Sequence, residues 1–246
     1  MKKPITSLFL FFSVFTSFSA LSYEKGDLLV RAGIALLEPQ EKSDTLLITA
    51  PALGMSKVPL DNVVGTKTGL GIGNKLALAG SLSYVLNSNW GIETLIGLPV
   101  ELNVTAKGLG ALGIDDVAKA KVLPLTLSAQ YYPTMTNSVF QPYMGIGVNY
   151  TYIANVDLDD SVEPAFGSPK IDFGFDDSFG YILNAGVDLK INDIWFANIA
   201  IYYINLETDA EADILQSAAL GGADAILETS IEANTFVYFL NAGYRF

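Results

Sequence analysis

The last stretch of the chain, residues 231–246, alternates without a break between apolar and mixed side chains and ends on a phenylalanine. Counting back in twos from Phe246 to Phe236 gives only apolar or aromatic side chains, whereas the positions between them include Arg245 and Asn241. Side chains along a strand point alternately to opposite faces. One face therefore suits lipid and the other suits a packed interior, which is the pattern of a strand in a membrane β-barrel.

The N-terminus predicts export. Lys2 and Lys3 precede an apolar run over residues 5–18, and the small residues Ala20 and Ser22 follow it. This is the arrangement of a secretory signal peptide, so we expect a signal peptide over residues 1–22 and a mature domain over residues 23–246. An uncleaved anchor helix is the alternative, although the run is shorter than the ~20 residues that a spanning helix needs.

Half of the residues are hydrophobic, yet no later segment is a continuous apolar run long enough for a transmembrane helix. An exported chain of this kind satisfies its backbone in lipid only as a closed barrel. Eight segments alternate with the period of a strand: 28–36, 76–86, 90–104, 123–131, 140–152, 179–189, 195–203 and 231–246. The predicted fold is all-β, an eight-stranded antiparallel transmembrane β-barrel.

The connections between these segments are alternately short and long. We expect the short ones, at residues 87–89, 133–139 and 192–193, to be periplasmic turns. The long ones, at 38–74, 108–118, 156–177 and 212–230, are expected to be extracellular loops. Aromatic side chains near the strand ends predict two membrane girdles, formed by Trp90, Trp195, Phe140, Tyr131 and Phe246 at the turns and by Tyr150, Tyr152 and Tyr203 near the loops. A soluble barrel is the alternative, but it would carry charges on its outer face.

Composition removes several classes of function. The chain contains no cysteine and no histidine, so it lacks disulfides, thiolate metal sites and the commonest general base. We therefore expect no cofactor, no metal and no enzymatic activity. The formal charge is −12, and loss of Lys2 and Lys3 with the signal peptide gives −12 − 2 = −14. Such acidity argues against nucleic-acid binding.

Polar residues on the inward face of the segments are the candidate lumen residues. They are Arg31, Glu93, Glu101, Gln130, Gln141, Asn149, Asn184, Asn241 and Arg245, with Asp188 among the same inward positions. Eight strands leave a bore just wide enough for side chains or one small ligand. A plug, in which Arg31 pairs with a glutamate of the third strand, is the favoured interpretation of these residues, and a ligand path is the alternative.

The first long loop is unusually apolar. Its apolar side chains are candidates for an apolar entrance to the lumen, and packing of these side chains on each other is the alternative. They are Leu46, Leu47, Ile48 and Leu53. The acidic residues of the third loop lack the regular framework of a calcium loop, so a solvated surface is the favoured interpretation.

Four segments resemble the outer membrane protein W family: Gly-Asp-Leu-Leu-Val-Arg-Ala-Gly at 26–33, Leu-Pro-Leu-Thr-Leu-Ser-Ala-Gln-Tyr-Tyr at 123–132, Gln-Pro-Tyr-Met-Gly-Ile-Gly-Val-Asn-Tyr-Thr at 141–151, and Ala-Gly-Tyr-Arg-Phe at 242–246. The resemblance implies an outer-membrane protein with a narrow lumen that passes small hydrophobic molecules. Its expected partners are outer-membrane lipid, lipopolysaccharide, the barrel assembly machinery and small hydrophobic solutes. A non-conducting surface protein, such as an adhesin, a phage or toxin receptor or an envelope stabiliser, is the competing class.

Overall fold

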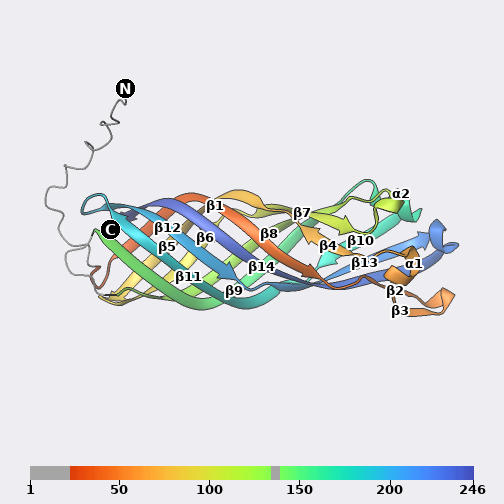
Figure 1. Ribbon diagram of the computed structural model, residues 1–246, viewed down its shortest axis with the longest axis horizontal. Coiled ribbons are helices and arrows are strands. Elements are labelled where there is room, and N and C mark those ends of the chain that lie inside the picture. The colour runs from red at the N-terminus through yellow and green to blue at the C-terminus, as the bar shows by residue number, and fades with distance from the viewer. Residues whose placement is uncertain (1–22, 134–138) are drawn as a thin grey trace, which may run out of the picture.

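The computed structural model describes residues 23–133 and 139–246, and strands make up most of this part of the chain (Figure 1). The predicted signal peptide, residues 1–22, lies outside the described residues. The strands are β1 (Leu28–Ser43), β2 (Leu47–Ala50), β3 (Met55–Pro59), β4 (Gly69–Ile72), β5 (Lys75–Asn87), β6 (Trp90–Gly97), β7 (Val100–Lys107), β8 (Asp116–Tyr131), β9 (Phe140–Leu158), β10 (Lys170–Phe175), β11 (Ser178–Lys190), β12 (Trp195–Ile204), β13 (Glu207–Ser217) and β14 (Ala223–Arg245). The two short α-helices are α1 (Asp61–Val64) and α2 (Val162–Phe166).

Eight of these strands form a closed antiparallel ring. They follow the order β1-β5-β6-β8-β9-β11-β12-β14, and β14 also pairs with β1. In the register of β14, Leu240 lies between Ile34 of β1 and Ile199 of β12. Seven of the eight predicted segments lie in this ring and the third does so over β6, so the predicted eight-stranded fold is confirmed. The sheet is thus closed on itself, which is the condition for crossing a bilayer with strands.

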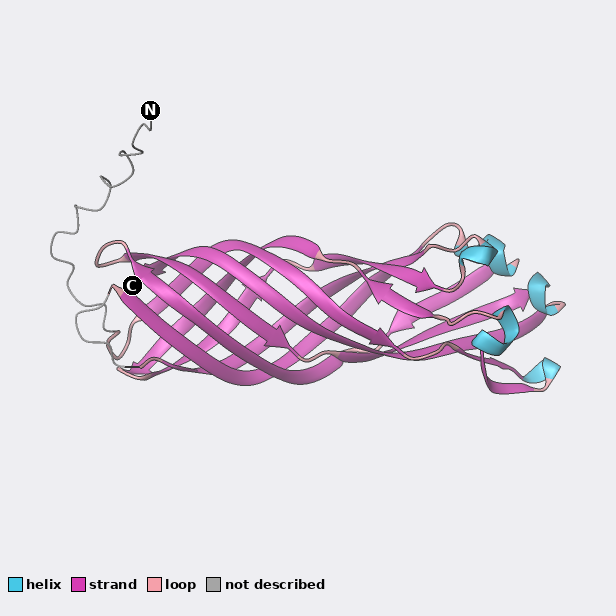
Figure 2. Ribbon diagram, viewed as in Figure 1, coloured by secondary structure: helices cyan, strands magenta, loops and turns pink. Residues whose placement is uncertain are grey.

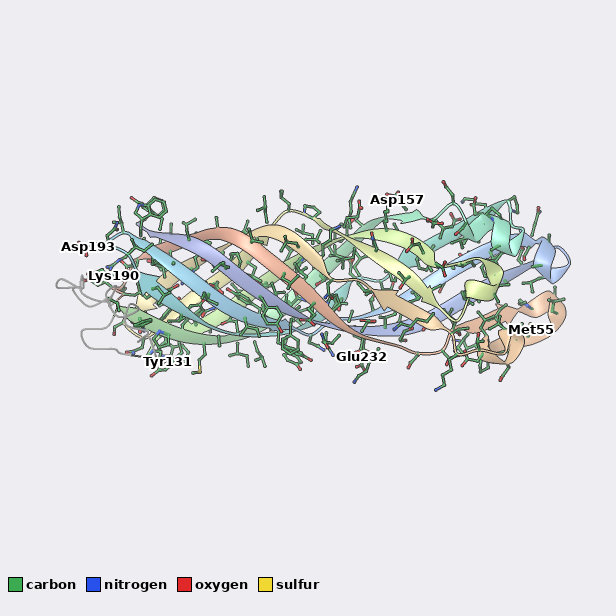
Figure 3. All side chains as sticks on the ribbon, turned by 45° about the horizontal axis from the view of Figure 1, so that its top comes forward. Met55, Tyr131, Asp157, Lys190, Asp193 and Glu232 are labelled. Carbon is green, nitrogen blue, oxygen red and sulfur yellow. The ribbon has the colours of Figure 1, made fainter. Side chains whose placement is uncertain are left out.

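The two ends of the molecule differ. The C-terminus lies at one end with the short turns, here named the turn end, and both helices lie at the other, the helix end (Figure 2). In Figure 3, Tyr131 and Asp193 are near the turn end, Met55 is near the helix end, and Glu232 lies between them. Among the described residues, no helix is both long and apolar enough to cross a membrane.

The outer face of the ring changes character along its length. On β14 the outward side chains from Phe246 back to Phe236 are apolar or aromatic, and Leu240 is 61 % exposed. Two steps further on, Glu232 is exposed. The apolar stretch from 236 to 246 matches the roughly 9–11 residues of a membrane-spanning strand. The change at Glu232 therefore indicates where lipid gives way to water.

The long connections were predicted to be loops, and the structure adds that much of their length is β-structure. β1 continues to Ser43, and β13 and β14 form a hairpin over most of the predicted loop at 212–230. We name this part of the barrel, towards the helix end, the extension. Side chains still alternate here, but the outer face contacts water in place of lipid: Ile214 is buried inside and Asp213 is exposed. A half-buried, water-facing sheet of this kind is ordinary β-structure.

The extension encloses a hydrophobic core of its own. Its buried members come from strands, helices and connections alike and include Leu46, Ile48, Leu60, Leu70, Leu109, Ile114, Phe166, Ile171, Ile214 and Leu227. A second core cluster, which includes Leu29, Ile182, Phe196, Tyr202 and Phe239, fills the barrel itself. Each level of the molecule thus has a hydrophobic cluster of its own.

The third predicted strand is interrupted, which corrects part of its predicted faces. Continuing the pairing of Glu93 with Ser128 would place Val100 opposite Lys121, but Val100 pairs with Val122. This one-residue shift exchanges the two faces of a strand. Beyond it Val104 is buried and Asn103 is exposed, the reverse of the prediction.

Candidate functional site

Arg31 is the centre of a polar plug in the barrel, towards the turn end. Its side chain is fully buried and lies between two carboxylates. Nη2 and Nε donate to the two oxygens of Asp188 at 2.8 and 3.3 Å, and Nη1 is 3.2 Å from Oε2 of Glu93. Charge-assisted bonds of this geometry satisfy a guanidinium that has no access to water.

The sequence of β5 explains why these groups meet. Arg31 pairs in register with Ser81 of β5, and Ser83 of β5 pairs with Glu93 of β6. Both serines are small and point inward, so they leave room for the long side chains of the strands on either side. Their hydroxyls then donate to Glu93 Oε2 at 3.3 and 3.0 Å. We define the polar plug as Arg31, Ser81, Ser83, Glu93 and Asp188.

Aromatic rings close the plug. The guanidinium carbon of Arg31 lies 5.2 Å from the ring centre of Tyr143 and 5.3 Å from that of Phe196, which are cation–π distances. Tyr23, just before β1, donates its hydroxyl to Asp188 at 2.5 Å and packs edge-on against Tyr132. Charge and ring packing together fill the bore at this level.

Above the polar plug lies a small apolar cavity of about 90 Å³. Tyr202 and Phe239 form part of its lining, and the Tyr202 hydroxyl donates to Oε1 of Glu93 at 3.1 Å, which joins the cavity to the plug. The lining includes inward side chains such as Leu37 and Val237. It also includes Leu78, Ile96 and Leu98, which are 54–72 % exposed on the outer face. The cavity therefore extends into the barrel wall.

The wall is incomplete beside this cavity. The pairing of β6 with β8 ends at Glu93 and Ser128, and the pairing of β7 with β8 starts at Val100 and Val122. Over residues 94–99 no backbone ladder joins the two sides. One substitute is the amide of Leu95, which donates to the Thr126 hydroxyl at 2.9 Å. Pro99 has no amide hydrogen and cannot contribute to a ladder. We name residues 94–99 and 123–127 the wall gap.

The predicted lumen residues have three outcomes. Arg31 and Glu93 meet in the polar plug, and five of the others are buried: Gln130, Gln141, Asn149, Asn184 and Asn241. Arg245 lies at the rim of the turn end, where Nε is 2.9 Å from Asp27. Glu101 was placed wrongly. Glu101 follows the wall gap, where the one-residue shift has exchanged the two faces. Its neighbours Val100 and Leu102 line the cavity, so Glu101 between them belongs to the outer face.

The predicted loop entrance is divided by the structure. Leu46 and Ile48 are buried in the core of the extension. Leu47 lies on the opposite side of β2, beside an acidic surface cleft, and Leu53 is 47 % exposed. The packing alternative thus describes two of the four residues. The predicted girdle residues point outward, and Trp90 packs against Tyr131 with ring centres 5.1 Å apart.

Sequence reasoning missed several groups of the site. Phe196 and Tyr143 share the inward parity of Asn198 and Gln141, so alternation alone could have found them. Tyr23 precedes the first strand and has no such signal. Its role depends on the path of the chain across the turn end.

The comparisons with known proteins agree with this geometry. The sequence model of the OmpW family matches residues 24–246. The chain belongs to the OmpW family. Outer membrane protein W of Vibrio cholerae is 34 % identical over the full length of both chains. This OmpW-family protein is therefore an outer-membrane protein.

Two further relatives bear on structure and context. The crystal structure of OprG from Pseudomonas aeruginosa is similar with a TM-score of 0.74 and 29 % identity, over 92 % of this chain and 98 % of that one. A protein of Pseudomonas aeruginosa named dibenzothiophene metabolism operon protein PahQ is 31 % identical over 54 % of this chain and 58 % of its own length. An OmpW-type eight-stranded outer-membrane barrel is thus shown by both fold and sequence.

Proposed function

We propose that this barrel is a narrow channel for passive diffusion of small hydrophobic molecules across the outer membrane. The observation that carries the proposal is the apolar cavity, whose lining combines inward and lipid-facing side chains beside the wall gap. A solute in this cavity is separated from the lipid by side chains alone, because residues 94–99 have no ladder to β8.

The polar plug determines which way a solute can leave the cavity. It fills the bore with buried charge between the cavity and the turn end, and an apolar solute that crossed it would have to displace paired charges. Leaving through the wall gap avoids that cost, since the solute passes from an apolar cavity into hydrocarbon. The route we propose therefore runs from the core of the extension to the cavity and then sideways into the membrane.

The chemistry of the solute follows from the lining. Apart from Thr151, Thr235 and the Tyr202 hydroxyl, the cavity is lined by aliphatic, proline, glycine and phenylalanine residues. Burial of an ionised group there would be expensive. The printed name of PahQ refers to the metabolism of dibenzothiophene, an aromatic and apolar compound, which supports the same class of solute.

Uptake by reconstituted vesicles tests the proposal. The vesicles carry lipopolysaccharide in the outer leaflet, and the measurement is the rate at which a tracer reaches an enclosed reporter. We expect faster arrival of an apolar aromatic tracer in the presence of the protein, and no effect on a charged tracer of equal size. Ala79→Phe, which fills the cavity, should remove most of the gain, whereas Ala197→Phe on the outer wall should keep it.

The competing function is a non-conducting surface protein. The fully buried polar plug and the packed core of the extension favour it, because both obstruct a straight path. Uptake of the apolar tracer equal to that of protein-free vesicles would support this alternative and would overturn the channel.

A further inference from the structure

The flank of the extension has two strand edges that do not pair with each other. On one side, β9 pairs with β11 only up to Thr151, although β9 itself continues to Leu158. On the other side, β10 pairs with β13 alone. In the part of the chain that the structure describes, no ladder therefore joins residues 152–158 to β10. We name these two edges the side seam. Asp157, an exposed residue of β9 in the seam, lies on the flank of the molecule and not at its tip (Figure 3).

Side chains replace the ladder at both ends of the side seam. The amide of Ile153 donates to Oδ1 of Asp177 at 2.9 Å, and the amide of Ile171 donates to Oε1 of Glu163 at 3.3 Å. Amide directions alternate along a strand, so the amide of Phe173 points to the same side as that of Ile171. β10 is therefore an edge strand that is held by a neighbouring strand on one side only.

The core of the extension approaches water along the side seam. Leu227 and Ile231, which lie on a strand paired on both sides, are 7 % and 0 % exposed. The apolar side chains of the seam pack against the same core but are only partly buried. They are Ile153, Val156 and Leu158 on β9 and Phe173 and Phe175 on β10.

Two spaces meet at Phe173. Outside lies the acidic surface cleft beside Leu47, with a volume of about 740 Å³, and inside lies an apolar cavity of about 50 Å³ in the core of the extension. Phe173 lines both. Ala210 and Thr229 also line both, but they pair with each other in the interior of the sheet. Phe173 lies on an edge strand, so its ring can turn aside where no ladder closes the wall.

Apolar side chains continue inward from this point to the larger cavity beside the wall gap. Leu206 lines that cavity and also packs against the core of the extension. Val122 lines it as well, and pairs in register with Ile153 of the side seam. A solute that passes Phe173 therefore stays among apolar groups until it reaches the wall gap.

The outer cleft selects by charge. Lys57 is the only basic residue of its lining, and Lys57 is paired with Glu228 at 2.7 Å. The other charged lining residues are all acidic: Asp44, Asp172, Asp176, Asp209, Glu211 and Asp213. A cleft lined by one sign of charge repels ions of that sign, including the phosphate groups of lipopolysaccharide. The cleft thus remains accessible to neutral solutes in an anionic surface layer.

We propose that Phe173 is a gate at which neutral apolar solutes enter the extension from its flank, out of the acidic cleft. This inference rests on the proposed channel function and names its entrance. The alternative entrance is the tip of the extension, where the short helices lie (Figure 2).

Blocking each entrance in turn tests the proposal. The chain has no cysteine, so single-cysteine variants can be modified with a bulky neutral methanethiosulfonate reagent. In vesicles with lipopolysaccharide, modified Phe173→Cys should lose most of the gain in uptake of the apolar aromatic tracer, and a reductant that removes the label should restore it. Leu112→Cys is the matched control at the tip, where Leu112 is 42 % exposed, and should keep its uptake after modification.

A second variant and a second readout keep the test independent of one substitution. Should Phe173→Cys fail to fold, Val156→Cys places the label on the opposite edge of the side seam and should block uptake in the same way. The tracer should also slow the modification of Phe173→Cys, because it occupies the gate. It should leave the modification of Leu215→Cys, on the outer face of β13, unchanged.

Unchanged uptake by Phe173→Cys and Val156→Cys after verified modification would overturn the gate and leave the channel in place. Loss of uptake in modified Leu112→Cys alone would assign the entrance to the tip, with the same consequence. Absence of tracer uptake by the unmodified protein would overturn the channel and the gate together.

Discussion

Replacing Arg31 by methionine should lower the free energy of unfolding by about 3–5 kcal/mol, because removal of one member of a buried ion pair leaves the other charge uncompensated. Here two carboxylates lose their counter-charge. Glu93 and Asp188 are 1 % exposed or less and would remain buried without the counter-charge of Arg31. Methionine keeps much of the volume and the contacts with Tyr143 and Phe196, so the change isolates the charge.

Urea unfolding in detergent, followed by tryptophan fluorescence, measures this effect. The matched control is Lys107→Met, which removes one member of the exposed pair with Glu41 at 3.2 Å. An exposed pair contributes only about 0–1 kcal/mol. Equal stability losses in Arg31→Met and Lys107→Met would show that the polar plug does not depend on its charge pairing.

Leu240→Arg should lower the free energy of unfolding into the membrane-free state by about 2–4 kcal/mol, the cost of a basic side chain at the middle of a lipid face. Leu240 is 61 % exposed, lies between Ile34 and Ile199, and sits near the middle of the apolar stretch 236–246. Its burial by other protein groups is small, so the penalty comes from lipid.

Unfolding of the barrel from lipid vesicles by urea measures this penalty. Leu215→Arg is the control, since Leu215 is 38 % exposed but belongs to the water-facing extension on β13. A surface substitution in water should change stability by no more than about 0.5 kcal/mol. A similar large loss in both variants would contradict the boundary between lipid and water that Glu232 marks.

The alternation of apolar and polar side chains predicted the eight barrel strands, because successive side chains of each strand face lipid and the barrel interior in turn. It failed at β6 and β7, where Pro99 and a one-residue shift exchange the faces and move Glu101 outward. No local pattern contains that shift, since it depends on how a neighbouring strand continues. The strands within the long loops were missed for a related reason. Water on the outer face of β13 and β14 makes a strand look polar, which in sequence is indistinguishable from a loop.

The polar plug was predictable in part. Inward parity placed Arg31 and Glu93 on facing strands, and pairing of these opposite charges followed from the narrow bore. The sequence did not reveal that Asp188 takes two bonds from Arg31, or that Tyr23 caps Asp188. Both contacts join residues that are more than 150 positions apart, so they depend on closure of the ring.

A disulfide across the wall gap tests lateral passage of the solute most directly. The chain has no cysteine, and Leu95 and Thr126 lie across the gap within one hydrogen bond. The double variant Leu95→Cys/Thr126→Cys should take up the apolar tracer when reduced and lose most of that uptake when oxidised. Ile146→Cys/Leu183→Cys, across paired positions of β9 and β11 away from the wall gap, should be insensitive to oxidation. Unchanged uptake by the oxidised Leu95→Cys/Thr126→Cys variant, with the disulfide verified, would contradict passage through the wall gap.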